Sequence, residues 1–91
     1  MLNTRDALEL YTVLLPIKKL VSFKDSGINI IKQIISLNGE IFIKMLCIFT
    51  GKSRDDVIKM ERYEAINLFS EGLLENNIPS LIQFWETLGY D

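Results

Sequence analysis

The chain has 91 residues, of which 48% are hydrophobic, and its ten basic and twelve acidic side chains leave a net charge of −2. This length suits one small domain, and the absence of histidine removes the commonest general base and the commonest metal ligand. The basic residues are scattered, with Lys18–Lys19 the only adjacent pair, so no basic stripe is present to neutralise nucleic-acid phosphates.

So apolar a composition has two explanations. A small domain leaves much of its surface in water, so the excess apolar side chains either cover a self-association or partner-binding face or build an unusually apolar core. The single Cys47 excludes an internal disulfide and is typical of a reducing compartment. The N-terminal residues MLNTRDALEL are charged and polar early, unlike a secretory signal. Lys32, Lys44 and Asn38-Gly39 interrupt the apolar stretches, which are shorter than the roughly 20 residues of a membrane span.

The first predicted helix begins at Asn3 or Thr4, since either side chain suits an N-cap. Pro16 lacks an N–H group, so the helix kinks or ends there, and residues 16–23 can restart as a short helix with proline in its first position. Residues 24–27 are predicted to form a loop. The helical pattern there consists of Leu8, Tyr11 and Leu15 at i, i+3 and i+7 spacing, with Leu14 beside them.

Two apolar runs, residues 28–37 and 40–50, flank Asn38-Gly39. This dipeptide between isoleucine-rich runs is a hairpin signal, and isoleucine favours strands. The apolar side chains nevertheless recur at helical spacing, which favours two helices over the hairpin. Gly39 is then expected as the C′ residue of the first helix, and Glu40 suits the positive end of the second. The side chains with helical spacing are Ile30, Ile31, Ile34 and Ile35 in the first run and Phe42, Met45, Leu46 and Phe49 in the second.

Residues 50–53 read TGKS, like the end of a phosphate-binding P-loop. The full motif needs a strand before it and another glycine five residues before Gly51, but that position is Leu46, inside an apolar run. We predict instead that Gly51 ends one helix in the left-handed conformation and that Ser53 caps the next helix, over residues 54–60.

A longer helix is predicted over residues 62–75, ended by Asn76-Asn77. Gly72 inside it costs about 1 kcal/mol relative to alanine. Pro79 suits the first turn of a last helix, which Gly89 closes. We therefore predict an all-α fold, a single-domain bundle of about five to six helices over residues 1–91. One face of the longer helix carries Tyr63, Ile66, Phe69 and Leu73, and one face of the last helix carries Leu81, Phe84, Trp85 and Leu88.

No catalytic residue, cofactor or metal site is expected, and we predict that the protein is not an enzyme. Cys47 lies between Leu46 and Ile48 and is expected to be a small buried hydrophobe. The acidic pairs Asp55-Asp56 and Glu61/Glu64 suit helix starts and solvated faces. The aromatic side chains are expected in the core, although Tyr and Trp also dominate interface hot spots; they are Tyr63, Phe69, Phe84 and Trp85.

Residues 49–60, FTGKSRDDVIKM, have the order of a helix-turn-helix. A recognition helix brings Arg, Lys, Asn or Gln to the base edges, whereas this one brings Asp55 and Asp56 toward the phosphates. The order of these helices makes a small DNA-binding regulator an alternative function, but the two aspartates make it a poor one. A helical dimeric adaptor or antitoxin-like module is another alternative.

Residues 38–89 resemble the tail assembly chaperones of long-tailed phages and prophages. The shared order is an apolar helix, a TGKS-like turn, a short acidic helix, a longer helix that ends in asparagine, and an aromatic helix. The resemblance implies a small helical protein without enzymatic function that binds the tape measure protein and keeps it soluble. It also implies that the protein covers exposed apolar stripes of the tape measure protein by helix-in-groove packing, and that it helps tail tube polymerisation.

The resemblance also sets the expected partners and location. They are the tape measure protein and the tail tube protein, with a homo-oligomer in the host bacterial cytoplasm, no nucleic acid, no membrane, and no place in the mature virion. Five apolar side chains near the C-terminus are the predicted partner contacts: Phe69, Leu73, Leu74, Phe84 and Trp85.

Overall fold

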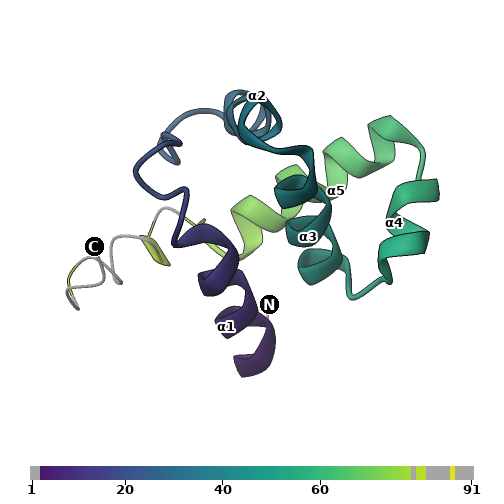
Figure 1. Ribbon diagram of the computed structural model, residues 1–91, viewed down its shortest axis with the longest axis horizontal. Helices are drawn as coiled ribbons and strands as arrows, with labels where there is room; N and C mark the ends of the chain where they lie inside the picture. Colours follow the sequence, from purple (N-terminus) through teal and green to yellow (C-terminus); the bar gives the residue numbers. More distant parts are fainter. Residues whose placement is uncertain (1–2, 79, 82–86, 88–91) are drawn as a thin grey trace.

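The computed structural model describes residues 3–78, 80, 81 and 87, and within them the protein is all-α, as predicted (Figure 1). Ile78, Ser80 and Leu81 are helical, so a helical segment begins soon after α5. Thr87 is helical as well, and the rest of the predicted last helix, including Leu88 and Gly89, lies outside the described residues. The helices in chain order are α1 (Thr4–Leu14), α2 (Gly27–Leu37), α3 (Gly39–Thr50), α4 (Arg54–Lys59) and α5 (Arg62–Glu75).

Helix α3 is the centre of the fold, because it contacts each of the other four helices. Figure 1 shows α2 above α3, α1 to its lower left and α4 to its right, with α5 passing behind. Glu40 and Lys44 are the only charged side chains of α3, so apolar groups point in nearly every direction around its axis. Such a helix is stable only where neighbours cover it, and Met45 and Leu46 are accordingly fully buried.

All five helices contribute to one hydrophobic core. Phe69 of α5 is fully buried within it. Its ring stacks on Phe42 with centroids 4.7 Å apart and meets Phe49 edge-on at 5.4 Å. Aromatic pairs of this kind stabilise by about 0.5–1.5 kcal/mol beyond the area they bury, so the contact between α3 and α5 is a main support of the fold.

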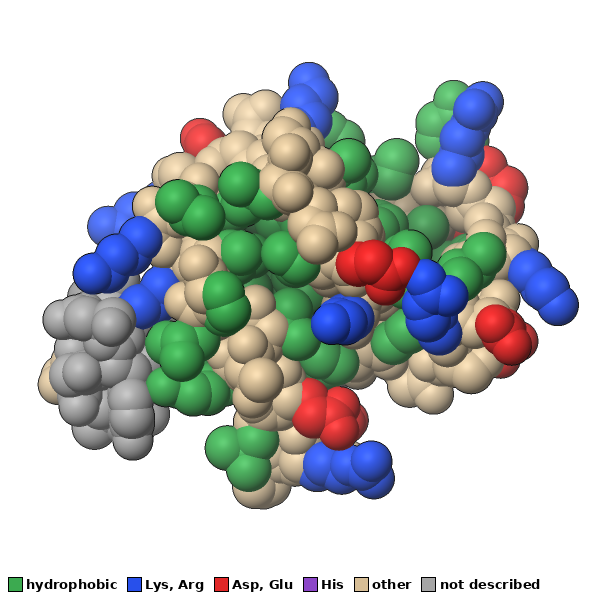
Figure 2. All heavy atoms as spheres, in the orientation of Figure 1, with side chains coloured by type: hydrophobic (Ala, Val, Ile, Leu, Met, Phe, Trp, Pro, Cys, Tyr) green, Lys and Arg blue, Asp and Glu red, His purple; other side chains and the backbone are tan. Residues whose placement is uncertain are grey.

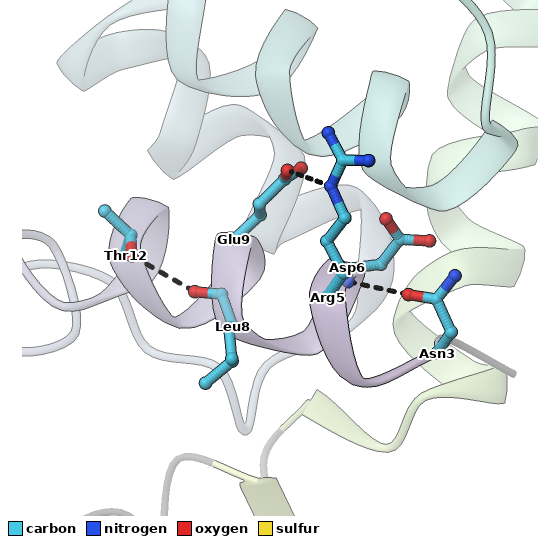
Figure 3. A network of polar contacts seen from close by, with 6 residues as sticks. All are labelled: Asn3, Arg5, Asp6, Leu8, Glu9 and Thr12. Atoms are coloured by element: carbon cyan, nitrogen blue, oxygen red, sulfur yellow. Dashed lines mark hydrogen bonds and ion pairs between the residues drawn. The ribbon is translucent and has the colours of Figure 1, made fainter.

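A polar side chain starts each helix by accepting a hydrogen bond from a backbone N–H that the helix leaves unpaired. In α1, Oδ1 of Asn3 accepts from the N–H of Asp6 at 2.8 Å, and the next turn carries an Arg5–Glu9 ion pair (Figure 3). Of the two predicted caps, Asn3 is therefore the one used. The N-cap residues of α1 to α5 are Asn3, Ser26, Asn38, Ser53 and Glu61.

The TGKS segment ends one helix and starts another, as predicted. Gly51 has a φ of +72°, and its N–H donates to the carbonyl of Cys47 at 2.9 Å. Oγ of Ser53 accepts from the N–H of Asp56 at 3.2 Å and so caps α4. The left-handed residue turns the chain sharply, which brings α4 back against α3.

The buried face of α1 is not the one marked by the spacing of Leu8, Tyr11 and Leu15. Leu10 and Leu14 are fully buried, whereas Leu8 is 63% exposed and Leu15 is 36% exposed. Two residues span about 200° around a helix axis, so packing Leu10 against the core turns Leu8 toward solvent. Helical spacing identified the helix, but contact with α3 selected which of its apolar stripes is buried.

The segment after Pro16 forms hydrogen-bonded turns rather than a short helix. The helix α1 ends at Leu14, as the proline predicted. The N–H groups of Leu20 and Val21 then both donate to the carbonyl of Ile17. Ile17, Val21 and Phe23 are buried, so these turns are packed into the core instead of standing as a separate helix.

The junction between α2 and α3 confirms the two helices and excludes the hairpin, but Gly39 does not have its predicted role. Asn38 ends α2 and also caps α3, with a φ of −169°. This extended residue separates the helices without a left-handed C′ residue, so Gly39 becomes the first residue of α3. Glu40 lies in the first turn of α3, at the positive end, as expected.

The predicted core position of Tyr63 is wrong, and one of the isoleucines with helical spacing in α2 lies on the surface. Tyr63 is 63% exposed, and the guanidinium of Arg62 lies over its ring, 5.0 Å from the centroid. Ile35 is 50% exposed. In both helices the buried stripe is centred on other residues: Ala65 and Phe69 in α5, and Ile34 in α2.

Candidate partner-binding surface

Three of the five predicted partner contacts are described by the structure, and these three do not form one exposed surface. Phe69 is fully buried and Leu73 is 5% exposed, because α5 packs this face against α3. The prediction is therefore corrected for these two residues, which belong to the core. Leu74 is 82% exposed. Phe84 and Trp85 lie outside the described residues.

Leu74 borders a groove of about 350 Å³ between the start of α2 and the second half of α5. Ile28, which is 50% exposed, lines the groove from α2. Leu73 also lines it, so the structure brings Leu73 and Leu74 to the same place although it buries only the first. The remaining lining residues are Phe23, Asp25, Gly27, Ile30, Ile66, Asn67 and Ser70.

Small residues and one glutamine position the walls of this groove. A Cβ on Gly27 would lie 3.5 Å from Oγ of Ser70, so the start of α2 approaches α5 closely. Gln33 of α2 accepts a hydrogen bond from the N–H of Ser22 at 2.7 Å and donates one to Asp25 at 3.2 Å. These bonds hold the turn that carries Phe23, and so fix the wall opposite α5.

The groove is chemically suited to packing rather than to catalysis. Among the described residues that line it, Asp25 is the only ionisable side chain. Exposed apolar side chains beside an apolar groove are typical of sites that receive a helix. A partner that buried the Leu74 side chain would gain about 2 kcal/mol from that residue.

A second hollow, of about 410 Å³, lies between α1 and α3. Figure 2 shows hydrophobic side chains between these helices, with acidic and basic side chains beside them. Arg54, which is hydrogen-bonded to Glu40, closes one side and joins the start of α4 to the start of α3. The apolar lining consists of Val13, Ile43, Cys47 and Ile48, and the polar lining consists of Glu9, Thr12, Glu40, Lys44 and Arg54.

Two groups in this hollow have shifted pKa values. Burial raises the pKa of the Cys47 thiol, so the uncharged form predominates near neutral pH and the thiol is a poor nucleophile. The hydrogen bond from Arg54 lowers the pKa of Glu40, so that carboxylate stays charged. A half-buried neutral thiol on an apolar wall agrees with the predicted role of Cys47 as a small hydrophobe.

In the described part of the chain, no group of three or more acidic or cysteine side chains is placed to hold a metal ion. None of the helices described is long and apolar enough to cross a bilayer. The α3–α4 pair has the order of a helix-turn-helix, but exposed Asp55 and Asp56 lead the second helix and would repel DNA phosphates.

Comparison of the chain with protein-family models, with curated proteins and with solved structures finds no match.

Ile28 and the groove that it lines were not predicted from the sequence. A signal was present, because α2 carries five isoleucines in eleven residues, more than one buried stripe accommodates. Ile30, Ile31 and Ile34 fill the buried stripe, which leaves Ile28 and Ile35 on the surface. Only the packing of α2 against α3 and α5 shows which isoleucines are left over.

Proposed function

We propose that this protein is a tail assembly chaperone that binds helical segments of a phage tape measure protein and keeps that protein soluble while the tail tube polymerises around it. The observation that carries the proposal is the 82% exposed Leu74 at the edge of the apolar groove between α2 and α5. The order of elements also supports it. An apolar helix, a Gly51 turn, a short acidic helix and a longer helix that ends at Asn76 follow one another, as in the chaperones that the sequence resembles.

The proposed mechanism is reversible helix packing. A tape measure protein is long, helical and prone to aggregate before the tube encloses it, so its apolar stripes need cover. Leu74 and Ile28 provide apolar surface on two sides of the groove, into which such a stripe packs. The contact requires no covalent step, so tube subunits displace the chaperone as they add. Several copies, as a homo-oligomer in the host cytoplasm, cover the length of the tape measure protein.

The test is co-expression of the full chain with its cognate tape measure protein. A soluble complex is expected with the unaltered chain, and Leu74→Glu should abolish it. Leu8→Glu is the matched control, since Leu8 is 63% exposed on α1 and does not line the groove. Neither change should lower stability by more than about 0.5 kcal/mol, because both side chains are largely in solvent.

Two results would contradict the proposal at different levels. If the tape measure protein stays insoluble with the unaltered chain and no complex is recovered, the chaperone function is wrong. If the complex forms but Leu74→Glu retains it as well as Leu8→Glu does, the function stands and the groove is the wrong site.

A further inference from the structure

The outward face of α2 carries two isoleucines and a lysine in one line. Ile28 and Ile35 are each 50% exposed and lie seven residues apart, which is two helical turns, so they share a face. Lys32 lies between them, four residues after the first and three before the second, and is exposed. Because Ile28 also lines the groove beside Leu74, this α2 stripe of Ile28, Lys32 and Ile35 extends the groove along the helix.

The lysine determines what kind of partner can cover this stripe. Lys32 is the only charged side chain of α2, and none of the described residues forms an ion pair with it. An apolar partner laid over the stripe would take water from the ammonium group and give nothing in return, which is costly. A partner with a carboxylate at that point compensates the lysine while its apolar residues cover Ile28 and Ile35.

A second copy of this chain is a poor occupant of the stripe. A twofold contact uses the same patch on both molecules, and the midpoint between Ile28 and Ile35 falls next to Lys32. Pairing two such helices antiparallel would bring the two Lys32 side chains together near the axis. Like charges in contact oppose association, so the charge pattern favours a different, acidic partner.

We propose that the α2 stripe, together with Leu74, docks an amphipathic helix whose apolar residues lie two turns apart with one Glu or Asp between them. This inference rests on the proposed function and specifies it further. It states which segments of a tape measure protein the chaperone takes: those in which a carboxylate interrupts the apolar stripe.

The probes are two fluorescein-labelled helical peptides that carry leucines seven residues apart and differ only in a Glu or a Lys midway between them. Fluorescence anisotropy at low salt with the full chain should show about fivefold tighter binding of the Glu peptide, the size expected for one exposed charge pair. Lys32→Glu should reverse this preference. Lys19→Glu makes the same charge change at an exposed lysine in the turns after α1 and should preserve it.

Each other outcome overturns the inference. Equal binding of the two peptides, a preference that Lys32→Glu leaves unchanged, or no binding of either peptide would show that the stripe does not read a carboxylate. A dimer in light scattering that Ile35→Glu abolishes would assign the stripe to a second copy. Failure of the proposed function is a separate result: it is the absence of any complex between the unaltered chain and the tape measure protein.

Discussion

The contact between α3 and α5 makes Gly72→Ala a sensitive test of the fold. Gly72 lies inside α5 and is buried, and a Cβ at this position would overlap the ring of Phe49. Taken alone, the helix position favours alanine over glycine by about 1 kcal/mol. Beside the ring of Phe49, however, the same methyl group overpacks the core. The substitution therefore sets local propensity against tertiary packing.

The cost of overpacking should exceed the gain in helix propensity. Real Cβ atoms essentially never approach another atom this closely, and the atoms met include Cγ of Phe49, which is near the root of the side chain rather than at its end. The ring cannot withdraw freely, because it also packs edge-on against Phe69 at 5.4 Å. Overpacking costs about 1–3 kcal/mol, and a clash this severe belongs near the upper limit. After subtracting the helix gain of about 1 kcal/mol, we expect a net loss of about 2 kcal/mol.

Urea unfolding followed by circular dichroism measures this loss, which corresponds to a fall in Tm on the order of 10 °C for a domain of this size. Gly39→Ala is the control, since no atom lies within 4 Å of the Cβ it would add, and it should be neutral or mildly stabilising. In a Phe49→Ala background the obstruction is gone, so Gly72→Ala should stabilise by about 1 kcal/mol. If Gly72→Ala stabilises the unaltered protein, or the sign does not change with Phe49, the reasoning is wrong.

Three further predictions concern the turn between α3 and α4 and the Glu40–Arg54 ion pair that joins the starts of these helices. Gly51→Ala should lower the free energy of unfolding in urea by about 1 kcal/mol. The left-handed φ of +72° is the only cause, because no atom obstructs the new methyl group. Gly51→Asn should lower it less, and equal losses for the two variants would refute the role of φ. Ser53→Ala should lower the free energy of unfolding by about 1 kcal/mol, because the N–H of Asp56 loses its hydrogen-bond acceptor. Ser53→Asp should retain stability. An unchanged urea midpoint for the alanine variant would contradict the role of Ser53 as a cap. Arg54 lowers the pKa of Glu40 below its ordinary value of 4.5, so the stability from this pair is present above pH 4.5 and is lost as the pH falls through the lowered pKa. The urea midpoint should therefore fall more on acidification in the unaltered protein than in the Glu40→Gln variant. Parallel curves for the two proteins would refute this linkage.

Both explanations for the apolar composition apply to the described structure. One core runs through all five helices, yet large apolar side chains such as Leu74, Leu20 and Ile28 remain at least half exposed. The exposed ones at the groove are the surface that the proposed function uses. Because they contribute little to the core, their substitution should separate binding from stability, whereas substitution of Phe69 would reduce both.

The sequence by itself determined the five helices from α1 to α5 and several of the points where they end. Some residues act locally: Pro16 and Gly51 through their own backbone geometry, and Ser53 through a hydrogen bond to a residue three positions away. Their effects can therefore be predicted without knowledge of the fold. Helical period also outweighed the hairpin signal of Asn38-Gly39, because apolar spacing reports on a whole segment and the turn signal on two residues.

Only the tertiary structure decided which apolar residues lie inside. Leu8, Ile35 and Tyr63 fit the helical period as well as their buried neighbours do, yet each is at least half exposed. Their helices each have more than one apolar stripe, and the choice depends on how α3 packs against α1, α2 and α5. The groove and the line of Ile28, Lys32 and Ile35 follow from that choice, because a surface is what remains after the core has been filled.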